Sequence, residues 1–370
     1  MYNWQTKKLG EVCEIKTGKK DVNQGNPNGK YPFFTCAKEH TYSDVYSFDT
    51  EAILIAGNGD VGSLNYCNGK FEAYQRTYVL SEFKEIDAKY LLYVLDGSLK
   101  DVVSKQKLGN TMPYIKLGML AEFLIPIPPL SEQKRIVKVL DEIFENIEKA
   151  KRNAEKNLKN SKEIFESYLQ SVFENPEKDW EEKTLDEVCE ISSKLVDPRK
   201  PEFLDLIHVG AGNMETKSEK LIDLKTAREE KLISGKFLFD ESMVLYSKIR
   251  PYLMKVARPN FSGLCSADIY PLVPRKNLNR DYLFHLLLTS MFTEFAIKGS
   301  ARAGMPKVNR EHLFSFNFFL PPITKQKAIV KKLDVLAGET KKLEAIYKQK
   351  LADLDELKKS VLKKAFSGEL

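Results

Sequence analysis

The feature that most constrains this chain is a junction that occurs twice. The stretch PPLSEQKRIVKVLD at 128–141 recurs as PPITKQKAIVKKLD at 321–334, with nine of fourteen positions identical. A proline pair ends any preceding helix, and the residues after each pair place apolar side chains at spacings of three and four. The repeat therefore predicts two copies of one unit, each closed by a long helix that begins at its prolines.

A second repeat lies upstream of the first. WQTKKLGEVCEI at 4–15 matches WEEKTLDEVCEI at 180–191 at eight of twelve positions. Between these anchors the likeness is thin but ordered, since SFDTEAILI at 47–55 resembles LFDESMVLY at 238–246. Each half therefore opens alike, diverges and closes alike. A duplication without functional meaning is the alternative, but drift would blur the ends and the middles equally.

The long helices are predicted to carry a heptad-like apolar seam. It comprises Ile136, Leu140, Ile143 and Ile147 in the first helix and Ile329, Leu333, Leu336, Leu343, Tyr347, Leu354 and Leu357 in the second. Each helix has about 43 residues, which at ~1.5 Å per residue is roughly 65 Å. The two can pair as an antiparallel coiled coil, with a domain at either end and an internal pseudo-two-fold. Alternatively, each helix packs only on its own domain.

The predicted fold class is α+β. Two tandem mixed α/β domains are expected at 1–128 and 176–321, and the long helices at 129–175 and 322–370. Strand-like stretches such as EAILIA at 51–56 alternate with helical ones such as YLLYVLDGSL at 90–99.

Composition excludes several classes of protein. No run of about 18 apolar residues and no signal-peptide core is present, so neither a membrane span nor secretion is expected. The five cysteines form no CxxC pair and indicate free thiols in a reducing cytoplasm. The net charge is +6, but residues 1–130 carry 15 basic and 15 acidic side chains, whereas residues 323–370 carry 12 and 7. Charge alone therefore does not identify a DNA-binding domain.

One glycine-rich motif could be mistaken for a nucleotide site. GNGDVG at 57–62 fits GxGxxG after a strand, but a dinucleotide site needs a helix next. Here SLNYCNGKFEAYQ follows, whose Asn-Gly pair and alternating aromatics indicate a hairpin. We interpret it as a loop through which the backbone can approach a partner closely. No P-loop, HExxH, GxSxG or Asn/Asp-Pro-Pro-Tyr/Phe motif is found, so we predict no catalytic or metal-ligating residue.

Other residues resemble a known family. IPIPPLSEQKRIVKVLDEI at 125–143 and AFSGEL at 365–370 resemble the conserved helical regions of type I restriction–modification DNA specificity subunits. WQTKKLGEVCEI and its copy resemble the opening of that family's target recognition domains. The likeness covers the whole chain and implies that each domain reads one half of a split DNA target while the helices set the gap. A duplicated chain keeps a pseudo-dyad but lets its halves diverge, so the two half-sites should differ.

The resemblance also implies partners and cofactors. The helices and adjoining domain surfaces would bind two copies of a methyltransferase (M) subunit, which carries S-adenosylmethionine and methylates adenine in double-stranded DNA. Restriction (R) subunits would use ATP and Mg²⁺ to translocate and cut. No cofactor is expected in this chain itself.

Candidate DNA contacts come from the requirements of readout. Base reading needs Arg, Lys, Asn or Gln on exposed loops, and phosphate contact needs Lys, Arg or hydroxyl groups. The first-domain candidates are Lys19, Lys20, Asn58, Gln75, Arg76, Lys105, Lys107, Asn110 and Tyr114. The second-domain candidates are Arg199, Lys248, Arg250, Arg302, Lys307 and Asn309. The strongest prediction is the loop pair at 104–116 and 298–310, because both loops are basic, contain glycine and precede the long helices at matching positions.

Two rival functions remain open. A non-enzymatic coiled-coil adaptor would scaffold proteins without reading DNA sequence. An enzyme, either a fused restriction–methylation protein or a nucleotide-binding one, would need cofactor motifs that the sequence does not contain.

Overall fold

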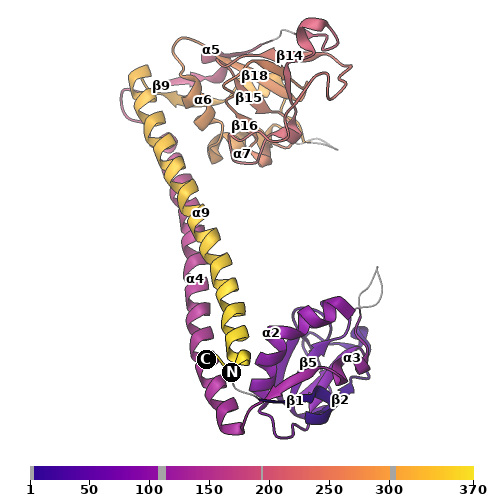
Figure 1. Cartoon of the computed structure of the whole chain (residues 1–370). Helices are drawn as coiled ribbons and strands as arrows, with labels where there is room; N and C mark the ends of the chain where they lie inside the picture. The colour runs from indigo at the N-terminus through magenta and orange to yellow at the C-terminus, as the bar shows by residue number, and fades with distance from the viewer. Residues whose placement is uncertain (1–3, 107–113, 193–194, 301–305) are drawn as a thin grey trace. The chain divides into compact units, whose positions relative to one another are not determined.

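The computed structural model describes residues 4–106, 114–192, 195–300 and 306–370. Within these residues the chain forms two compact units: unit 1 comprises 1–155 with 348–370, and unit 2 comprises 156–347. The long helices α4 (Leu130–Glu174) and α9 (Ile323–Ser367) contribute residues to both (Figure 1). Among the helices in the described part of the chain, none has the length and apolar character needed to cross a bilayer.

Unit 1 is built on a mixed sheet of strand order β2-β7-β5-β6-β3-β4. Its strands are β2 (Glu14–Thr17), β3 (Tyr31–Phe34), β4 (Thr41–Ser43), β5 (Phe48–Ala56), β6 (Leu64–Ala73) and β7 (Thr77–Ser81). The helices are α1 (Leu9–Val12), η1 (Val22–Gln24), α2 (Ala88–Gln106) and α3 (Leu117–Ala121), and β1 (Gln5–Lys8) pairs with β8 (Leu124–Ile127). The β3–β6 pairing is parallel, and the other pairings in this sheet are antiparallel.

The two faces of this sheet bury different cores. Side chains alternate along a strand, so Ile53 and Ile55 of β5 face a core shared with Tyr90 and Leu91 of α2. Leu54, between them, belongs to a smaller core on the other face. The apolar run predicted as a strand at 51–56 is therefore buried on both sides.

Unit 2 contains a sheet of order β10-β18-β15-β16 and another of order β11-β14-β17-β12-β13. The first is built from β10 (Cys189–Ile191), β15 (Val244–Ser247), β16 (Val256–Ala257) and β18 (Ile269–Pro274). The second is built from β11 (Leu195–Val196), β12 (Ile207–Val209), β13 (Lys225–Thr226), β14 (Lys236–Phe239) and β17 (Gly263–Cys265). The helices are α5 (Leu185–Val188), η2 (Pro201–Phe203), η3 (Ala211–Asn213), η4 (Pro251–Leu253), α6 (Arg280–Leu286), α7 (Ser290–Lys298) and α8 (Arg310–Phe314), and β9 (Glu181–Thr184) pairs with β19 (Asn317–Leu320).

Strand β15 repeats the two-sided burial of β5. Val244 and Tyr246 face a core that includes Phe292 of α7, whereas Leu245 faces a core with Phe239 of β14. The apolar stretch at 281–298 is divided into α6 and α7, and the Thr289 hydroxyl caps α7 by accepting from the Phe292 N–H.

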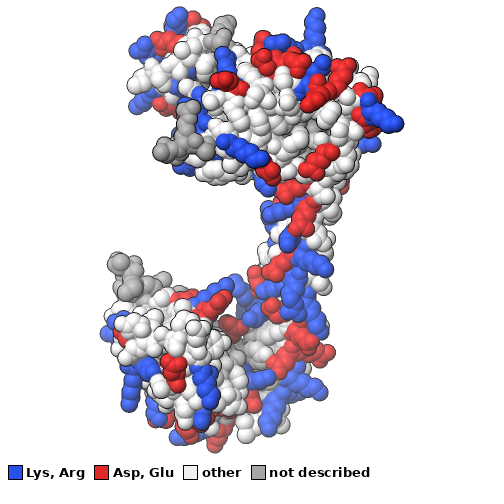
Figure 2. Space-filling view, turned by 180° about the vertical axis from the view of Figure 1, so that it is seen from behind, with Lys and Arg blue, Asp and Glu red and all other residues white. Residues whose placement is uncertain are grey.

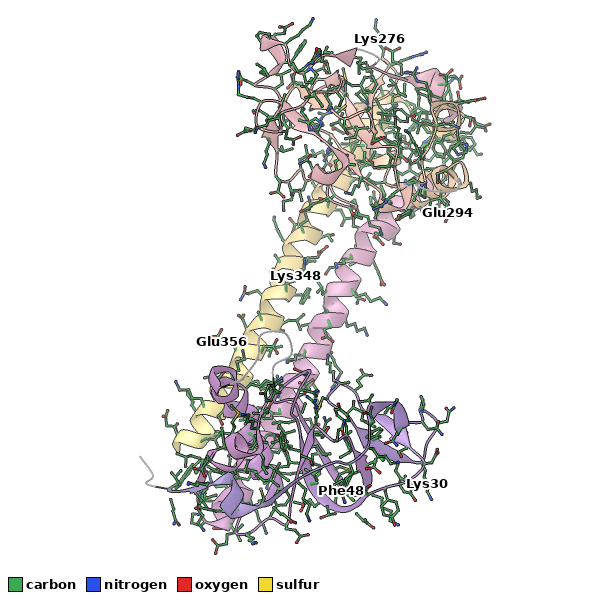
Figure 3. All side chains as sticks on the ribbon, turned by 90° about the vertical axis from the view of Figure 1, so that its right-hand side faces the viewer. Lys30, Phe48, Lys276, Glu294, Lys348 and Glu356 are labelled. Carbon is green, nitrogen blue, oxygen red and sulfur yellow. The ribbon has the colours of Figure 1, made fainter. Side chains whose placement is uncertain are left out.

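The long helices run antiparallel within each unit. In unit 1 the start of α4 lies beside the end of the chain, since the Arg135 guanidinium donates to the Leu370 carbonyl oxygen at 2.7 Å. In unit 2 the end of α4 shares a core with the start of α9, through Phe173 and Leu333. Figure 3 shows Lys348 and Glu356 along the part of α9 that belongs to unit 1. The predicted antiparallel pairing of the two helices is confirmed.

Most of the predicted seam is buried or half-buried. The buried members are Ile136, Leu140, Ile147 and Leu333, and the half-buried ones are Ile143, Ile329, Leu336, Tyr347 and Leu354. Leu343 and Leu357 correct the prediction, because they are 38% and 47% exposed. Thr340, which lies between Leu336 and Leu343 in the same three-and-four spacing, is buried.

The repeated junction has a structural explanation in a buried glutamine. Gln133, in the first turn of α4, is fully buried. Its amide donates to the carbonyl oxygens of Pro128 at 2.9 Å and Glu85 at 3.1 Å, and its Oε1 accepts from the Asp87 N–H at 2.7 Å. One side chain thus joins the start of α4 to the residues that precede α2.

The second copy repeats these bonds. The fully buried Gln326 donates to the carbonyl oxygens of Pro321 at 2.8 Å and Asn277 at 2.9 Å, and it accepts from the Asn279 N–H at 2.7 Å. Asn279 in turn caps α6. The junction is therefore written twice because each domain is fixed to its long helix by the same hydrogen bonds.

The predicted hairpin after the glycine motif lies elsewhere than expected. Strands β5 and β6 form an antiparallel hairpin, and the glycine motif itself makes the connection between them. Asn68 and Gly69, predicted as the turn, lie inside β6, where Gly69 has φ +115°. No helix follows the glycine motif directly, since β6 is the next element in this fully described stretch.

Candidate nucleic-acid interface

In unit 1, three segments that are far apart in sequence meet at the end of β5. The Gly57 N–H donates to the Arg76 carbonyl oxygen at 3.0 Å, in the turn between β6 and β7. An isolated bridge joins Asn58 to Tyr114, and the Ile115 N–H donates to Gly57 at 2.9 Å. The glycine loop, the β6–β7 turn and the segment before α3 therefore form one surface.

Unit 2 forms the same arrangement at the end of β15. The Lys248 N–H donates to the Asp268 carbonyl oxygen at 3.0 Å, in the turn between β17 and β18. An isolated bridge joins Ile249 to Lys307, and the Val308 N–H donates to Lys248 at 2.8 Å. We call the two arrangements the first and second three-segment sites.

In each three-segment site, a tyrosine hydroxyl hydrogen-bonds to the backbone. The Tyr78 hydroxyl donates to the Ile115 carbonyl oxygen at 2.8 Å, and the Tyr270 hydroxyl donates to Val308 at 3.3 Å. Burial raises the pKa of both phenols, so each stays protonated and able to donate. The two sites therefore share the same backbone hydrogen bonds and the same tyrosine contact.

The side chains on this common frame differ at every matched position. The pairs are Gly57 and Lys248, Asn58 and Ile249, Arg76 and Asp268, and Tyr114 and Lys307. The first site presents one cation, one amide and one phenol. The second presents two lysines around one carboxylate. Two surfaces with the same backbone and different donors and acceptors can read different base sequences.

Close packing explains the glycine of the first site. A Cβ on Gly57 would lie 2.5 Å from the Arg76 carbonyl oxygen and 2.9 Å from the Tyr78 ring. At the matched position of the second site, the Lys248 side chain runs over the Tyr270 ring, with Nζ 4.8 Å from its centroid. The Tyr78 ring packs against Gly57 in the first site, and the Tyr270 ring makes a cation–π contact with Lys248 in the second.

Arg250 follows the second site in a strained backbone conformation. Its φ of +49° and ψ of 62° are left-handed, which costs a non-glycine residue about 1 kcal/mol. Its N–H donates to the Pro306 carbonyl oxygen at 2.9 Å, and Pro251 begins η4 directly after it. The side chain is exposed, so the fold holds an arginine outward at a position that favours glycine.

Other predicted contacts in unit 1 are placed less favourably. Lys19 is exposed, and the Gln75 side chain donates to Asp21 at 3.4 Å. Lys19 and Gln75 are both close in sequence to residues that hydrogen-bond with the first site. Lys20 is half-buried, with Nζ 3.3 Å from the Ser43 hydroxyl and 3.7 Å from the fully buried Glu72 carboxylate. Its charge balances a buried acid, which leaves it poorly placed for DNA.

Two candidates in unit 2 have local structural partners. The Asn309 side chain accepts from the His312 N–H at 2.7 Å and caps α8, so its oxygen is already used. Arg199, after β11, donates to both carboxylate oxygens of Asp197. Of the remaining candidates, Lys105 falls in α2, and Lys107, Asn110 and Arg302 lie outside the described residues.

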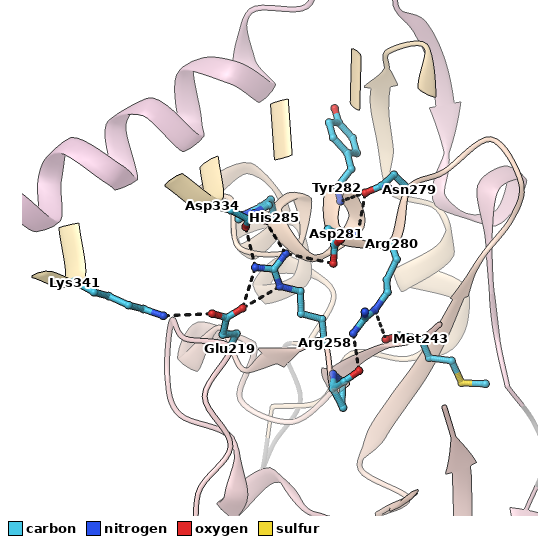
Figure 4. Close-up of polar contacts among 11 residues, drawn as sticks. Glu219, Met243, Arg258, Asn279, Arg280, Asp281, Tyr282, His285, Asp334 and Lys341 are labelled. Carbon is cyan, nitrogen blue, oxygen red and sulfur yellow. Dashed lines mark hydrogen bonds and ion pairs between the residues drawn. The ribbon is translucent and has the colours of Figure 1, made fainter. Parts of the chain in front are cut away.

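Sequence reasoning missed Asp268, Tyr78 and Tyr270. A signal was available, because RTYVL at 76–80 aligns with DIYPL at 268–272 in the repeat. It also missed the network in Figure 4, where Arg258 donates to Asp334 of α9 at 2.8 Å and to Glu219 at 2.9 Å. His285 lies 3.0 Å from the same Asp334 carboxylate. This network fastens the domain to its helix and is not part of the surface that we assign to DNA.

The surface charge is mixed. Figure 2 shows basic and acidic side chains interspersed over both units on the face in view.

Within 4–106, 114–192, 195–300 and 306–370, no group of three or more His, Cys, Asp or Glu side chains is placed to hold a metal ion.

Comparison with known proteins agrees with the duplicated organisation. A family model described as "Type I restriction modification DNA specificity domain" matches residues 1–157 and again 177–352. The EcoDI specificity subunit of a type I restriction enzyme from Escherichia coli is 32% identical over 401 residues, covering 100% of this chain and 89% of the relative. The MjaVIII specificity subunit from Methanocaldococcus jannaschii is 23% identical, covering 100% and 93%.

Solved structures share the fold. A chain from a study of complex assembly and conformational transition of the type I R-M system superposes with a TM-score of 0.77 at 18% identity, covering 100% of this chain and 99% of that chain. The HsdS subunit from Thermoanaerobacter tengcongensis superposes with a TM-score of 0.58 at 19% identity, covering 100% and 98%.

Proposed function

Because this chain belongs to the family of type I restriction–modification DNA specificity subunits, we propose that it chooses the duplex sequence on which a larger complex acts. Each target recognition domain reads one half of an asymmetric split target. The main observation in support is the pair of three-segment sites, which share their backbone hydrogen bonds but present different side chains. Identical sites would suit a palindrome, whereas unlike sites suit two unlike half-sites.

The long helices set the spacer between the half-sites. Each has 45 residues, which at ~1.5 Å per residue is about 68 Å, an upper bound of about 20 base pairs at ~3.4 Å each. The test removes one heptad from each helix at facing positions, 148–154 and 352–358, around the Lys151–Asp355 ion pair. The recognised spacer should shorten by about three base pairs while both half-sites stay the same. An unchanged spacer would contradict the ruler.

The chemistry belongs to partner subunits. Two methyltransferase subunits would dock on the helices and adjoining domain surfaces and supply S-adenosylmethionine, and restriction subunits would supply ATP- and Mg²⁺-dependent translocation and cleavage. The names of the relatives and the absence of catalytic motifs from the sequence support this division. Calorimetric titration of the chain alone with S-adenosylmethionine should give no binding heat, and a saturable signal would favour the enzyme alternative.

Residues 1–130 carry as many acidic as basic side chains, 15 of each, so we expect modest affinity for the chain alone. Partner subunits would then supply much of the phosphate contact. Nanomolar binding of its target by the isolated chain near physiological salt would overturn this division.

Methylome sequencing of a host that expresses the chain with its methyltransferase subunit is the decisive experiment. We expect one split motif with two different half-sites and methylated adenines. The adaptor alternative predicts no motif, and footprinting of the same complex would then show no sequence-selective protection.

A further inference from the structure

The second three-segment site holds two ammonium groups close together. Lys248 directly follows β15 and is half-buried, with its Nζ over the Tyr270 ring. Lys307 lies opposite Ile249 on the neighbouring segment, with its Nζ 3.7 Å from the Asp268 carboxylate. Burial, and then the charge of Lys307, lower the pKa of Lys248. Lys248 therefore stands in a position that disfavours its own charge.

The backbone keeps these lysines together. The Val308 N–H donates to the Lys248 carbonyl oxygen at 2.8 Å, and the Arg250 N–H donates to Pro306 at 2.9 Å, so the two segments are hydrogen-bonded on both sides of Ile249. Two like charges held close together repel each other, and this repulsion destabilises the fold. Asp268 is a single carboxylate, half exposed, and it offsets only part of this repulsion. A further anion between the lysines would offset the rest.

We propose that Lys248 and Lys307 together bind one backbone phosphate of the DNA, at the second half-site only. This inference rests on the proposed function and deepens it. Lysine is a compact point charge suited to phosphate, whereas planar bidentate recognition of a base edge is a property of arginine. The first site has Gly57 and Tyr114 at the matched positions, so it lacks the lysine pair.

The test uses the full chain with its methyltransferase subunit. The target is selected from a random duplex pool, and binding is measured by fluorescence anisotropy over a salt series. Lys248→Met keeps an unbranched stem over the Tyr270 ring, and Lys307→Gln removes the second charge. For this double variant, the magnitude of the slope of log K against log salt should be smaller by about 0.9, which is the value of one lost phosphate contact. Lys220→Gln, on an exposed lysine 3.1 Å from Glu215, is the matched control and should leave the slope unchanged.

Methylphosphonate scanning then locates the phosphate. Each phosphate of both half-sites is neutralised singly in the selected duplex. The wild type should lose affinity at one position of the second half-site, where the double variant should show no further loss. Lys307→Gln alone, on an exposed side chain, provides the same readout if the substitution at Lys248 unfolds the domain.

The outcomes separate the two levels of inference. If no phosphate position distinguishes wild type from variant, or if the variant instead changes the selected bases, the phosphate site is wrong while the proposed function stands. If the wild-type complex selects no sequence from the pool, the proposed function fails and the phosphate site fails with it.

Discussion

The two copies of this chain agree at one place and differ at another. The glutamines of the junctions, Gln133 and Gln326, make matching hydrogen bonds to a proline carbonyl, a second carbonyl and a backbone N–H. The three-segment sites match only in their backbone, and Arg76 of one stands where Asp268 stands in the other. The two copies have kept the hydrogen bonds that attach each domain to its helix, whereas the side chains of the three-segment sites have diverged. Attachment can thus stay constant while specificity diverges.

The largest expected effect tests whether the junctions are equivalent. Gln133→Leu and Gln326→Leu each leave two carbonyls, one of them buried, and one N–H without their partner, so each should lower the free energy of unfolding by about 3 kcal/mol. Denaturant unfolding of the full chain measures this. Gln349→Leu removes an exposed bond to Asp353 on α9 and should cost about 0.5 kcal/mol. A large loss from only one of the two junction variants would break the comparison.

A second prediction sharpens the difference between the sites. Arg76→Ala removes the exposed cation of the first site and should cost about 2 kcal/mol of base discrimination at one position of the first half-site. The second half-site should be selected as before. Random-pool selection with the assembled complex measures both halves at once. Lys16→Ala, on an exposed lysine paired with Glu14, is the control. Relaxation at both half-sites would show that the domains do not read independently.

The stability of unit 2 is expected to depend on pH through Asp334. Burial alone would raise the pKa of Asp334, but hydrogen bonds from His285 and Arg258 hold it at about 2, below the ordinary 3.8. A depressed pKa stabilises the fold above about pH 4 and loses that contribution as pH falls toward 2. Asp334→Asn should therefore cost about 1 kcal/mol near neutrality, after allowance for a side chain that is 39% exposed.

Denaturant unfolding at several pH values tests the sign of this effect. The difference between wild type and Asp334→Asn should shrink between pH 4 and pH 2. A difference that does not change with pH would remove the charge of Asp334 from the explanation. The first copy has Tyr93 donating to Asp141 at the equivalent helix position, so this network is particular to the second copy.

The smallest effect is at the strained arginine. Arg250→Gly relieves a left-handed backbone and should raise the free energy of unfolding by up to about 1 kcal/mol, whereas Arg250→Ala keeps the strain and should not. Both should weaken DNA binding alike, because both remove the exposed cation. Thermal unfolding and anisotropy on the same preparations separate the two effects. Equal stability of the two variants would mean that the backbone strain costs nothing.

Much of the architecture was predictable because its signals are local. The repeated prolines and the three-and-four spacing place the long helices almost to the residue, and apolar runs place β5 and β15. The second loop of the favoured pair could be matched to the first by position alone, and the structure brings Tyr114 to Asn58 and Lys307 to Ile249. Alignment of the two halves was enough for these predictions because duplicated backbones keep their register.

Only the tertiary structure decided which polar side chains are available. Lys20 and Asn309 have the composition of DNA contacts, but a buried glutamate and a helix terminus engage them. Leu343 and Leu357 have the spacing of a seam, but both side chains stay exposed in the folded chain. The sequence by itself determined the duplication, the helices and the strands, because these depend on neighbours along the chain. The reading surface depends on three segments that meet only after folding, so its charges could be located only once the hydrogen bonds between those segments were known.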